Sequence, residues 1–306
     1  MHPVPSLSTS CAAQAPGENR GMLLGLAGVA IFSLTLPFTR IAVAELDPLF
    51  VTLGRALGAA VLAAAWLLWK RAPLPGRADL LPLALVALGC VFGFPLLTSI
   101  AMRTLPAAHG AVLVGVLPLC TALYAALRGD ERTSRGFWLL ALLGSSLVVA
   151  FALAQGGGSL HLADLLVFGA VGLAAMGYAE GGRLARTLGS EATICWALVL
   201  AAAPSALLLA ALDAGQLARL GGVGARAWFA FGYVTLCSMF IGFFFWYRGL
   251  ALGGVARVGQ VQLLQPFLSL AGAALLLGEP LTLANCAFAL AVIGVVALGR
   301  RARVRR

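Results

Sequence analysis

The stretch LQPFLSLAGAALLLGEPLT, residues 264–282, has a counterpart earlier in the chain, LPLCTALYAALRGDE, residues 117–131. Both carry a proline near the start of an apolar run that ends at a glutamate. A shift of 148 residues places Pro118 on Pro266, and the two glutamates then also coincide. The sequence therefore contains two copies of one unit. Each copy holds about five membrane-length segments, and an odd number makes the copies enter a membrane from opposite sides, as in many secondary transporters.

Composition separates this chain from soluble proteins. Of its 306 residues, 61% are hydrophobic and 10% are charged, whereas ordinary soluble domains have roughly 45–50% and 25%. So few charges cannot cover the surface of a soluble domain, but lipid requires no polar cover. The apolar runs are continuous and rich in leucine and alanine, which favours helices over the alternating strands of a transmembrane barrel. The sequence predicts an all-α polytopic membrane protein.

Ten stretches are long enough to cross a bilayer as helices of about 20 residues. We place them at Gly21–Ala42, Pro48–Trp69, Leu80–Met102, Ala107–Leu127, Gly136–Ala154, Ala163–Ala185, Ala192–Leu212, Trp228–Tyr247, Val255–Leu277 and Leu281–Leu298. The predicted fold is ten transmembrane helices arranged as two inverted five-helix repeats. The predicted domains are a disordered cytoplasmic leader at 1–20, a first repeat at 21–155, a second repeat at 156–299 and a basic cytoplasmic tail at 300–306.

Basic residues predict the orientation in the membrane. With the N-terminus in the cytoplasm, most of them fall in cytoplasmic loops or in the tail, as the positive-inside rule requires. They are Lys70, Arg71, Arg77, Arg128, Arg132, Arg135, Arg183, Arg186, Arg248, Arg257, Arg300, Arg301, Arg303, Arg305 and Arg306. We expect a protein of the inner (plasma) membrane with both termini in the cytoplasm. Because the net charge of +10 is spread over separate loops, it indicates contact with anionic lipid and not with nucleic acid.

Residues that hold metals or cofactors are not grouped in this sequence. Five of the six cysteines lie singly inside apolar segments, the three histidines are far apart, and no Gly-rich phosphate-binding loop is present. We therefore expect no metal site, no cofactor and no ATP-driven activity. A membrane-embedded enzyme would need His, Asp or Glu side chains clustered at one face. The sequence shows no such cluster, so we predict that the chain is not an enzyme.

The repeated motifs resemble those of a known family. They are Leu46-Asp47-Pro48 with Arg55, then Leu117-Pro118 to Glu131, and finally Leu264-Gln265-Pro266 to Leu277-Gly278-Glu279-Pro280-Leu281-Thr282. On these residues the chain, from about Gly21 to Gly299, resembles the EamA-type family of the drug/metabolite transporter superfamily, in which two five-helix repeats make a ten-helix carrier. The resemblance implies movement of small organic metabolites, commonly export, coupled to protons or to exchange.

Prolines mark the expected route through the protein. Carriers built from inverted repeats hold their substrate near the bilayer midplane, in a cavity that opens alternately to each side. Pro118 and Pro266 fall near the middle of their segments, and Pro37 interrupts the first segment in a similar way. A proline removes a backbone donor and frees carbonyl groups, so these three are candidate hinge or gating positions. The alternative is that they are ordinary kinks accommodated by packing.

Polar side chains inside apolar segments are the candidate substrate contacts. An amide in hydrocarbon costs free energy unless it is paired, so Gln262 and Gln265, which share one helical face, should face protein, substrate or water, while Gln260 points elsewhere. These glutamines either bind substrate or join helices to one another. Tyr233 and Ser238 in the eighth segment are further candidates for the cavity lining. The first copy has valine or leucine in place of the glutamines, so we expect the cavity to be chemically uneven.

Two charged residues inside the segments have two interpretations each. An ionisable group at the centre of a transmembrane helix costs at least ~3 kcal/mol and usually marks function or an ion pair. Glu180 either pairs with Arg183 on the same helix or couples transport to protons or binds a substrate amine. Arg55 either extends outward to Glu45 or Asp47, which we favour, or points inward and holds a substrate carboxylate.

The function that these patterns favour is a secondary transmembrane transporter of small organic metabolites, an exporter of amino-acid-like or related compounds that works by alternating access. Its partners are a small-molecule substrate and the lipid bilayer, with the proton as candidate coupling ion. The alternatives are a non-transporting membrane partner and a channel, of which a channel would show a polar stripe along its pore. Saturable counterflow distinguishes a carrier from both.

Overall fold

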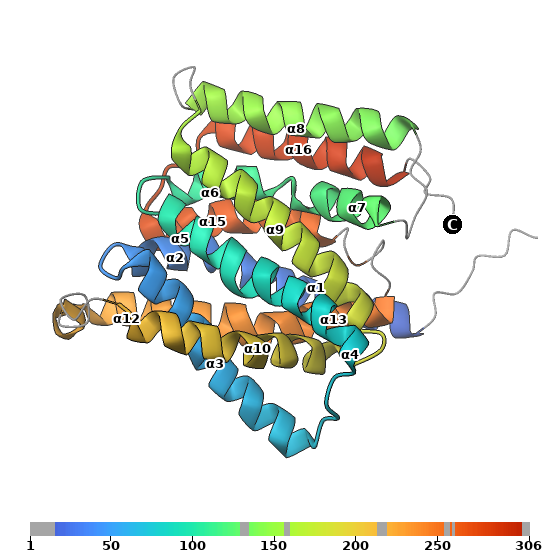
Figure 1. The fold of residues 1–306 in the computed structure, drawn as a ribbon. Helices are drawn as coiled ribbons and strands as arrows, with labels where there is room; N and C mark the ends of the chain where they lie inside the picture. Colours follow the sequence, from blue (N-terminus) through green and yellow to red (C-terminus); the bar gives the residue numbers. More distant parts are fainter. Residues whose placement is uncertain are drawn as a thin grey trace, which may run out of the picture.

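The computed structural model describes residues 16–128, 135–155, 160–212, 219–253, 258 and 261–301, and all regular structure in them is helical (Figure 1). The first half contains α1 (Pro16–Ser33), α2 (Thr35–Val43), α3 (Pro48–Lys70), α4 (Arg77–Val86), η1 (Ala87–Gly93), α5 (Phe94–Ala101), α6 (Ala107–Val114), α7 (Leu117–Leu127) and α8 (Arg135–Gln155). The second half contains α9 (Leu162–Leu184), α10 (Ser190–Ala210), η2 (Arg219–Gly222), α12 (Ala225–Gly232), η3 (Tyr233–Ile241), α13 (Gly242–Gly253), η4 (Val261–Leu264), α15 (Gln265–Leu277) and α16 (Leu283–Arg301).

The described helices account for every predicted membrane segment. Seven are long and apolar enough to cross a membrane: Asn19–Val43, Pro48–Lys70, Arg77–Ala101, Ala107–Leu127, Leu162–Leu184, Ser190–Ala210 and Ala225–Gly253. Shorter apolar helices at Leu142–Ala154, Val261–Leu277 and Leu283–Val295 coincide with the fifth, ninth and tenth predicted segments. Large apolar side chains such as Leu68, Leu139 and Leu275 are exposed on the outside, as a lipid-facing surface requires. The predicted fold class is confirmed.

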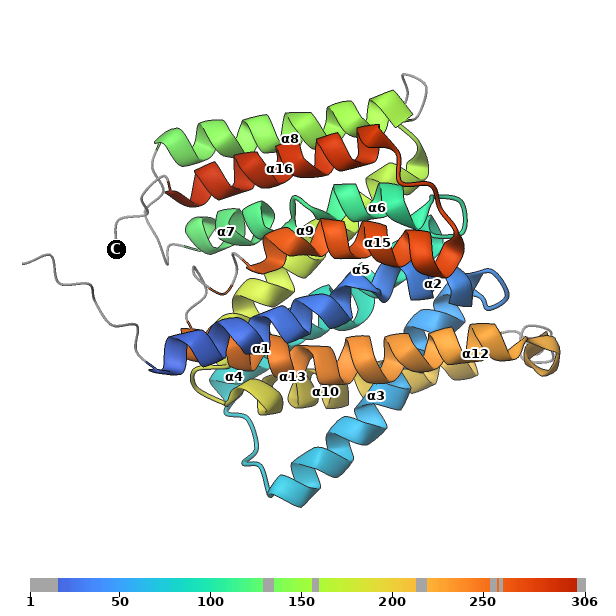
Figure 2. The ribbon, with the colours of Figure 1, turned by 180° about the vertical axis from the view of Figure 1, so that it is seen from behind.

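The two halves of the chain are intertwined. The third span of the first repeat, formed by α4, η1 and α5, packs against α9 of the second repeat. In the same way α13, which belongs to the third span of the second repeat, packs against α1 of the first repeat. Equivalent helices also pack together, namely α3 with α10, α6 with α15 and α8 with α16. Figure 2 shows α1 beside α13, with α8 and α16 at one edge of the bundle. Because each of these pairs joins one half to the other, the interior of the bundle lies between the repeats.

Several spans are irregular near their middles. The third and eighth spans carry π-helical turns, η1 and η3, at equivalent places in the two repeats. The first span breaks at Leu34 between α1 and α2, and the fourth breaks at Gly115–Val116 between α6 and α7. The ninth starts, within the described residues, with the 3₁₀ turn η4 before α15. Such irregular backbone occurs in membrane proteins where it lines a cavity or is buried by neighbouring helices.

The three candidate hinge prolines explain where the broken spans resume. Pro37, Pro118 and Pro266 each lie in the first turn of the helix that follows a break, in α2, α7 and α15 respectively. A proline has no backbone N–H and clashes with the preceding turn, so it is best tolerated where a helix begins. The prolines therefore produce short two-part helices. Whether they act as hinges stays a prediction.

Glycines permit the closest helix contacts. At Gly89 in η1, an added Cβ would meet the carbonyl oxygen of Leu173 and the backbone of Gly177 in α9. Gly21 and Gly249 bring α1 and α13 similarly close, in another contact between the two repeats. Because lipid provides no hydrophobic drive between helices, small residues stabilise such crossings by letting backbones approach and make dispersion contacts.

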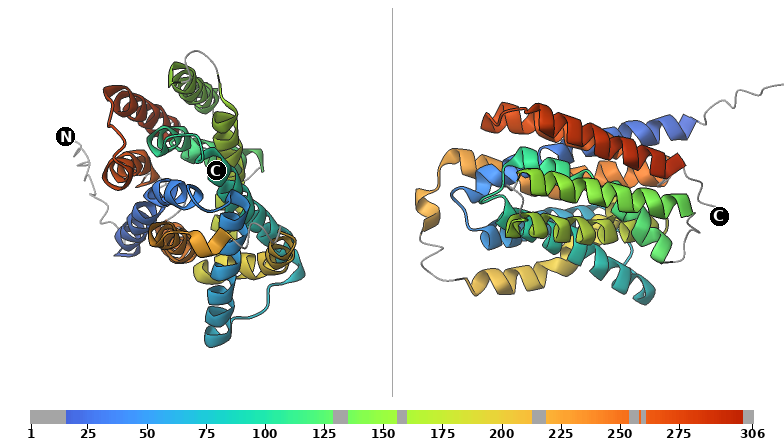
Figure 3. Two further views of the ribbon diagram at one scale, coloured as in Figure 1. Left: turned by 90° about the vertical axis from the view of Figure 1, so that its left-hand side faces the viewer. Right: turned by 90° about the horizontal axis from the view of Figure 1, so that it is seen from above.

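The start of α1 and the end of α16 lie at the same end of the bundle, as the views along and across the helices show (Figures 1 and 3). An even number of spans requires this arrangement. The assignment of that end to the cytoplasm stays a prediction. Gln260, Glu131, residues 1–15 of the predicted leader and residues 302–306 of the predicted tail lie outside the described residues. Residues 16–20, predicted to be disordered, form the first turn of α1, and residues 300–301 of the predicted tail belong to α16.

Candidate functional site

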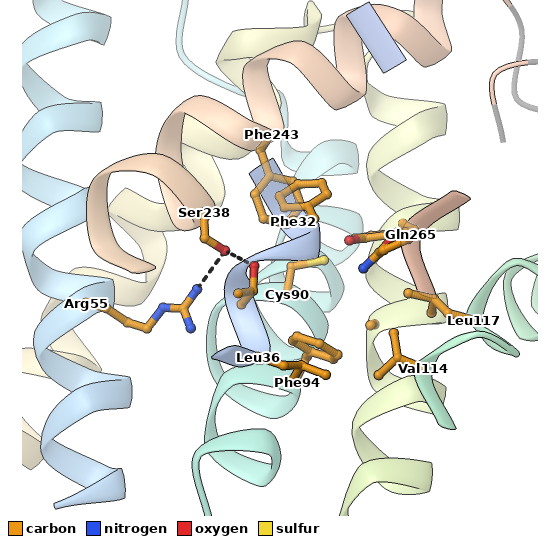
Figure 4. A pocket seen from close by; sticks show the side chains of 13 residues that line it. Phe32, Leu36, Arg55, Cys90, Phe94, Val114, Leu117, Ser238, Phe243 and Gln265 are labelled. Carbon is orange, nitrogen blue, oxygen red and sulfur yellow. Dashed lines mark hydrogen bonds between the residues drawn. The ribbon is translucent and has the colours of Figure 1, made fainter. Parts of the chain in front are cut away.

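A cavity lies where the irregular turns of the two repeats meet (Figure 4). Its cavity volume is about 30 Å³, which is room for about two water molecules in this conformation. The lining residues are Phe32, Thr35, Leu36, Arg55, Cys90, Phe94, Val114, Leu117, Ala174, Tyr178, Ser238, Phe243 and Gln265. They come from both halves of the chain, and they include members of η1, η3 and both sides of the breaks in the first and fourth spans. The cavity therefore lies between the repeats, at the position expected of a substrate site.

Arg55 in α3 is buried and faces the cavity. The residue is 2% exposed, and its Nη2 donates a hydrogen bond to Ser238 Oγ at 3.4 Å. Its Nε and Nη1 have no hydrogen-bond partner. Ser238 Oγ also lies 2.8 Å from Thr35 Oγ1, so three spans contribute one guanidinium group and two hydroxyl groups to the same corner of the cavity (Figure 4).

The favoured interpretation of Arg55, an outward contact with Glu45 or Asp47, is wrong. Asp47 caps α3 by accepting the backbone N–H of Leu49 at 2.8 Å, and Glu45 accepts the N–H of Gly224 at 2.6 Å at the start of α12. Both carboxylates thus pair with the backbone at helix N-termini, which attract anions. Arg55 lies about two turns into α3 on the face toward the interior, so it takes the alternative, inward position.

The four predicted substrate contacts divide into two groups. Gln265 and Ser238 line the cavity, and Gln265 is 8% exposed with no hydrogen-bond partner for its Oε1. Gln262 is also buried, but it lies on η4 and is not among the lining residues. Tyr233 lies outside the lining as well, and its hydroxyl donates to the carbonyl oxygen of Ile31 at 2.9 Å.

Aromatic rings form much of the cavity wall, and they were missed in the sequence. Phe32 packs edge-on against Phe243 with ring centroids 5.0 Å apart, and Tyr178 lies 6.0 Å from Phe243. Phe94 also lines the cavity. The 148-residue shift could have predicted part of the lining from the sequence. It pairs Cys90 with Ser238 and Leu117 with Gln265, so each candidate in the second repeat indicates a lining position in the first.

Glu180 lies in an ion-pair cluster at the end of the bundle that holds the start of α1. It is 1% exposed, and its carboxylate lies 2.9 Å from Arg128 Nε and 3.6 Å from Arg183 Nη1. Tyr124 donates its hydroxyl to the same carboxylate at 3.1 Å. The predicted pair with Arg183 is therefore present. The stronger contact, with Arg128, joins α7 of the first repeat to α9 of the second, and the sequence interpretation had assigned Arg128 only to orientation. A coupling role for Glu180 stays a prediction.

Glu279 forms a second cluster at the opposite end. Its two carboxylate oxygens accept the backbone N–H groups of Ala107 and Ala108 at 2.9 and 2.8 Å, and Arg40 Nε lies 3.3 Å from it. Arg40 also donates to the carbonyl oxygen of Leu105. The glutamate of the repeated motif thus binds the N-terminus of α6, where unpaired N–H groups attract anions. This cluster too joins the second repeat to the first.

A buried pair lies near the second cluster. His109 Nε2 in α6 lies 2.9 Å from Asp164 Oδ1 in α9, and Asp164 Oδ2 accepts the N–H of His161 at 2.9 Å. The pair of His109 and Asp164 therefore joins α6 to α9. Among the described residues, no group of three or more His, Cys, Asp and Glu side chains is placed to hold a metal ion.

These features define a class, a ten-span membrane protein of two intertwined five-helix repeats around a buried cavity. Comparison with known proteins identifies the family. The model of the EamA-like transporter family matches residues 19–152 and again residues 161–300, once in each half of the chain. The chain therefore belongs to the EamA-like transporter family, a member of the drug/metabolite transporter superfamily. It is a membrane transporter.

A relative and a solved structure agree with this assignment. The chain is 47% identical over 281 residues to a protein of Bacillus subtilis (strain 168) called "Uncharacterized transporter YdeK". The aligned residues cover 92% of this chain and 97% of the relative. A structure titled "Crystal structure of protein" matches with a TM-score of 0.64 at 21% identity, over 92% of this chain and 96% of the other, and this likeness shows the fold. The chain is a multi-pass membrane protein.

Proposed function

We propose that this protein is a secondary carrier, and not an enzyme, that exports small organic metabolites, amino-acid-like or related compounds, by alternating access. The observation that carries the proposal is the cavity between the repeats, with one ion-pair cluster toward each end of the bundle. Each cluster joins one repeat to the other. A carrier of this kind needs two such closures, because its site must never open to both sides at once.

The two clusters have the chemistry of reversible closures. Arg40 with Glu279 holds the first and fourth spans to the end of the ninth, and Arg128 with Glu180 holds the fourth span to the sixth. Arg128 and Arg183 are about half exposed, so water can solvate them when the cluster separates. Opening toward one side would break one cluster and leave the other intact, with Pro37, Pro118 and Pro266 as the hinge positions.

Orientation assigns the two closures to sides of the membrane. Both termini lie in the cytoplasm in this proposal, and the protein crosses the plasma membrane with its first repeat at 21–155 and its second at 156–299. The distribution of basic residues supports this orientation. The Glu180 cluster is then the cytoplasmic closure and the Glu279 cluster is the outer one.

Proton coupling through Glu180 is the remaining part of the proposal. Glu180 is a buried carboxylate in a closure between repeats, so gain or loss of its proton would change how tightly Arg128 is held. We expect Glu180→Gln to bind substrate but to lose the pH dependence of transport. Glu191→Gln is the matched control, because Glu191 pairs with Arg248 at 3.0 Å on the surface. Transport by Glu180→Gln with the parent's pH profile would remove this role.

Export is tested by the small molecules that cells release. Cells expressing the parent, Gln265→Ala or Gln262→Ala at equal membrane abundance would be compared by mass spectrometry of the medium. The proposal predicts at least one compound that accumulates outside with the parent and not with Gln265→Ala. Gln262→Ala is the matched control, a buried glutamine of the same span outside the cavity lining, and it should release the compound as the parent does. Identical media for all three would contradict a role of Gln265 in the export of any compound detected.

A channel and a non-transporting partner remain the alternatives. A channel would carry the released compound down its gradient without acceleration by substrate on the far side, and a partner would carry no flux. The cavity lining is mainly apolar, with a few polar groups from Arg55, Ser238, Thr35 and Gln265, which is the pattern of a binding site more than that of a continuous aqueous pore.

A further inference from the structure

We propose that Arg55 is an anion-binding residue and that the substrates of this carrier are small organic carboxylates with an apolar body. The carboxylate would bind Arg55 and the hydroxyl group of Ser238, and the apolar body would lie among the aromatic rings. This inference rests on the proposed carrier function and narrows it. It replaces a broad class of metabolites by compounds that bring a negative charge into the cavity.

The first support is the balance of charge. Among the side chains that line the cavity in the described residues, Arg55 alone is charged. A guanidinium group stays protonated and is costly to bury without an anion, yet this one is 2% exposed with two nitrogens unpartnered. The substrate is the group that can supply the missing anion.

The protein's own carboxylates are engaged elsewhere. In the part of the chain whose side chains are described, every acidic residue has a partner other than Arg55. These residues are Glu45, Asp47, Asp79, Asp164, Glu180, Glu191 and Glu279, with Gly224 N–H, Leu49 N–H, Gly76 N–H, His109, Arg128, Arg248 and Arg40 as respective partners. Among the described residues, Arg55 thus differs from the buried carboxylates of Asp164 and Glu180, which pair with His109 and Arg128 respectively.

The geometry around Arg55 suits a carboxylate. Unpaired Nε and Nη1 can each donate to an anion, and Ser238 Oγ, 3.4 Å from Nη2, is within reach of the same ligand. Thr35 Oγ1 holds Ser238 in place at 2.8 Å. Arg55 and Thr35 belong to α3 and α2 of the first repeat, and Ser238 belongs to η3 of the second. One bound anion would therefore contact both repeats.

The rest of the cavity defines the body of the ligand. Phe32, Phe243 and Tyr178 offer an apolar and aromatic wall, and Gln265 lies across the cavity from Arg55 (Figure 4). The free Oε1 of Gln265 can accept a hydrogen bond from an amine or amide of the substrate. Apolar α-amino acids satisfy all of these groups. Polyamines and quaternary amines would meet a like charge, and neutral bases would leave Arg55 unpaired.

The test measures binding without transport, so that it is independent of the carrier proposal. The thermal stability of the full-length protein in detergent would be measured with matched series on benzyl, isobutyl and methyl bodies, each supplied as the α-amino acid, the simple carboxylate, the primary amide and the amine. A ligand that binds only the folded protein raises its melting temperature. We expect stabilisation by carboxylates of at least one body, and none by the matched amides or amines.

Variants separate binding from a packing role. Arg55→Met should weaken the effective carboxylate by on the order of 100-fold, as loss of one partner of a buried charge pair does, and Arg55→Lys should retain part of the affinity. Without ligand, Arg55→Met should melt at or above the parent's temperature, because it removes an unpaired buried charge. An Arg55 that only packs would instead lower it.

Three results would overturn the proposal. They are stabilisation by amines or amides but not by carboxylates, carboxylate binding that survives Arg55→Met unchanged, and a panel in which no carboxylate stabilises the protein. Carboxylate binding without any transport in vesicles would contradict the carrier proposal and leave the anion site standing. Transport of a cation that competes with no carboxylate would contradict the anion site and leave the carrier proposal standing.

Discussion

The two repeats have the same backbone plan and different chemistry. Both contain a π-helical turn in their third span, η1 and η3, and both place that span against the first span of the other repeat. The lining positions differ, however, because Cys90 in the first repeat corresponds to Ser238 in the second, and Leu117 corresponds to Gln265. Arg55 corresponds to Ala203, which is exposed.

This difference assigns separate tasks to symmetry and to asymmetry. Two equivalent backbones of opposite orientation have two equivalent ways to pack, which gives the two states of alternating access. A substrate is not symmetric, so its recognition requires groups that the repeats do not share. In this chain the charge comes from the first repeat through Arg55, and the amide comes from the second through Gln265.

The largest effect is expected where close backbone contacts between the two repeats are broken. Gly89→Leu and Gly249→Leu place side chains against backbone atoms of the neighbouring helix, which cannot move aside, so each should cost about 3 kcal/mol or more. Gly172→Leu in α9 is the control, since nothing lies within 4 Å of its added Cβ and the residue is exposed. Recovery of monodisperse protein and its melting temperature would be measured. A melting temperature of either variant equal to that of Gly172→Leu would contradict these close backbone contacts.

The next effect concerns the amide of the second repeat. Gln265→Leu gives the second repeat the residue of the first, Leu117, and removes a buried polar group from the cavity. Loss of one hydrogen bond to substrate should weaken apparent affinity about 10- to 100-fold, while stability of the empty protein should stay equal or rise. Concentration-dependent transport checks the first part and thermal melting the second. Equal affinity in parent and variant would remove Gln265 from the substrate site.

A smaller effect is expected at the two closures. With the other cysteines replaced, Cys90 reports access to the cavity that it lines. Glu279→Gln weakens one closure and should raise labelling of Cys90 by a membrane-impermeant maleimide about tenfold from one side, because the charge-assisted contacts of this closure, worth about 1.5 kcal/mol, are weakened. Glu180→Gln should raise it from the opposite side. Labelling that increases from the same side in both variants would contradict opposed closures.

The smallest effect is expected at the hydroxyl group. Ser238→Cys gives the second repeat the residue of the first at this position and replaces a good hydrogen-bond partner of Thr35 and Arg55 by a weak one. The apparent affinity for substrate should fall only about threefold to tenfold, without a change in maximal rate. Initial rates over a range of substrate concentrations would show it, and a lowered maximal rate at unchanged affinity would assign Ser238 to movement instead of binding.

The spacing of prolines, glutamates and apolar runs was sufficient to predict ten spans in two inverted repeats. Those features depend on the length and order of segments, which the sequence states directly. The direction of Arg55 was not predictable in the same way, because it depends on where its acidic neighbours bind. Glu45 is held by Gly224, which is 179 residues away in the chain, and no local pattern around Arg55 records that contact.

The candidate site shows the same limit. Ser238 and Gln265 were found as polar residues in apolar segments, whereas Gln262 and Tyr233 carried the same signal and lie outside the lining. Tyr233 and Ser238 lie in the π-helical η3 and Gln262 lies in the 3₁₀ turn η4, where the rotation per residue differs from that of an α-helix, so α-helical spacing alone cannot separate them. Arg128, the nearest partner of Glu180, is 52 positions earlier in the numbering and was assigned only to the cytoplasmic loops.

The central claim is that a site between the repeats is exposed to one side at a time. Vesicles containing the purified protein would be loaded with the compound found in the release assay, and uptake of its labelled form would be compared with uptake into empty vesicles. A carrier predicts saturable labelled uptake that is several times faster into loaded vesicles, because bound substrate returns with the site. Uptake that is linear in concentration and equal in loaded and empty vesicles would contradict alternating access.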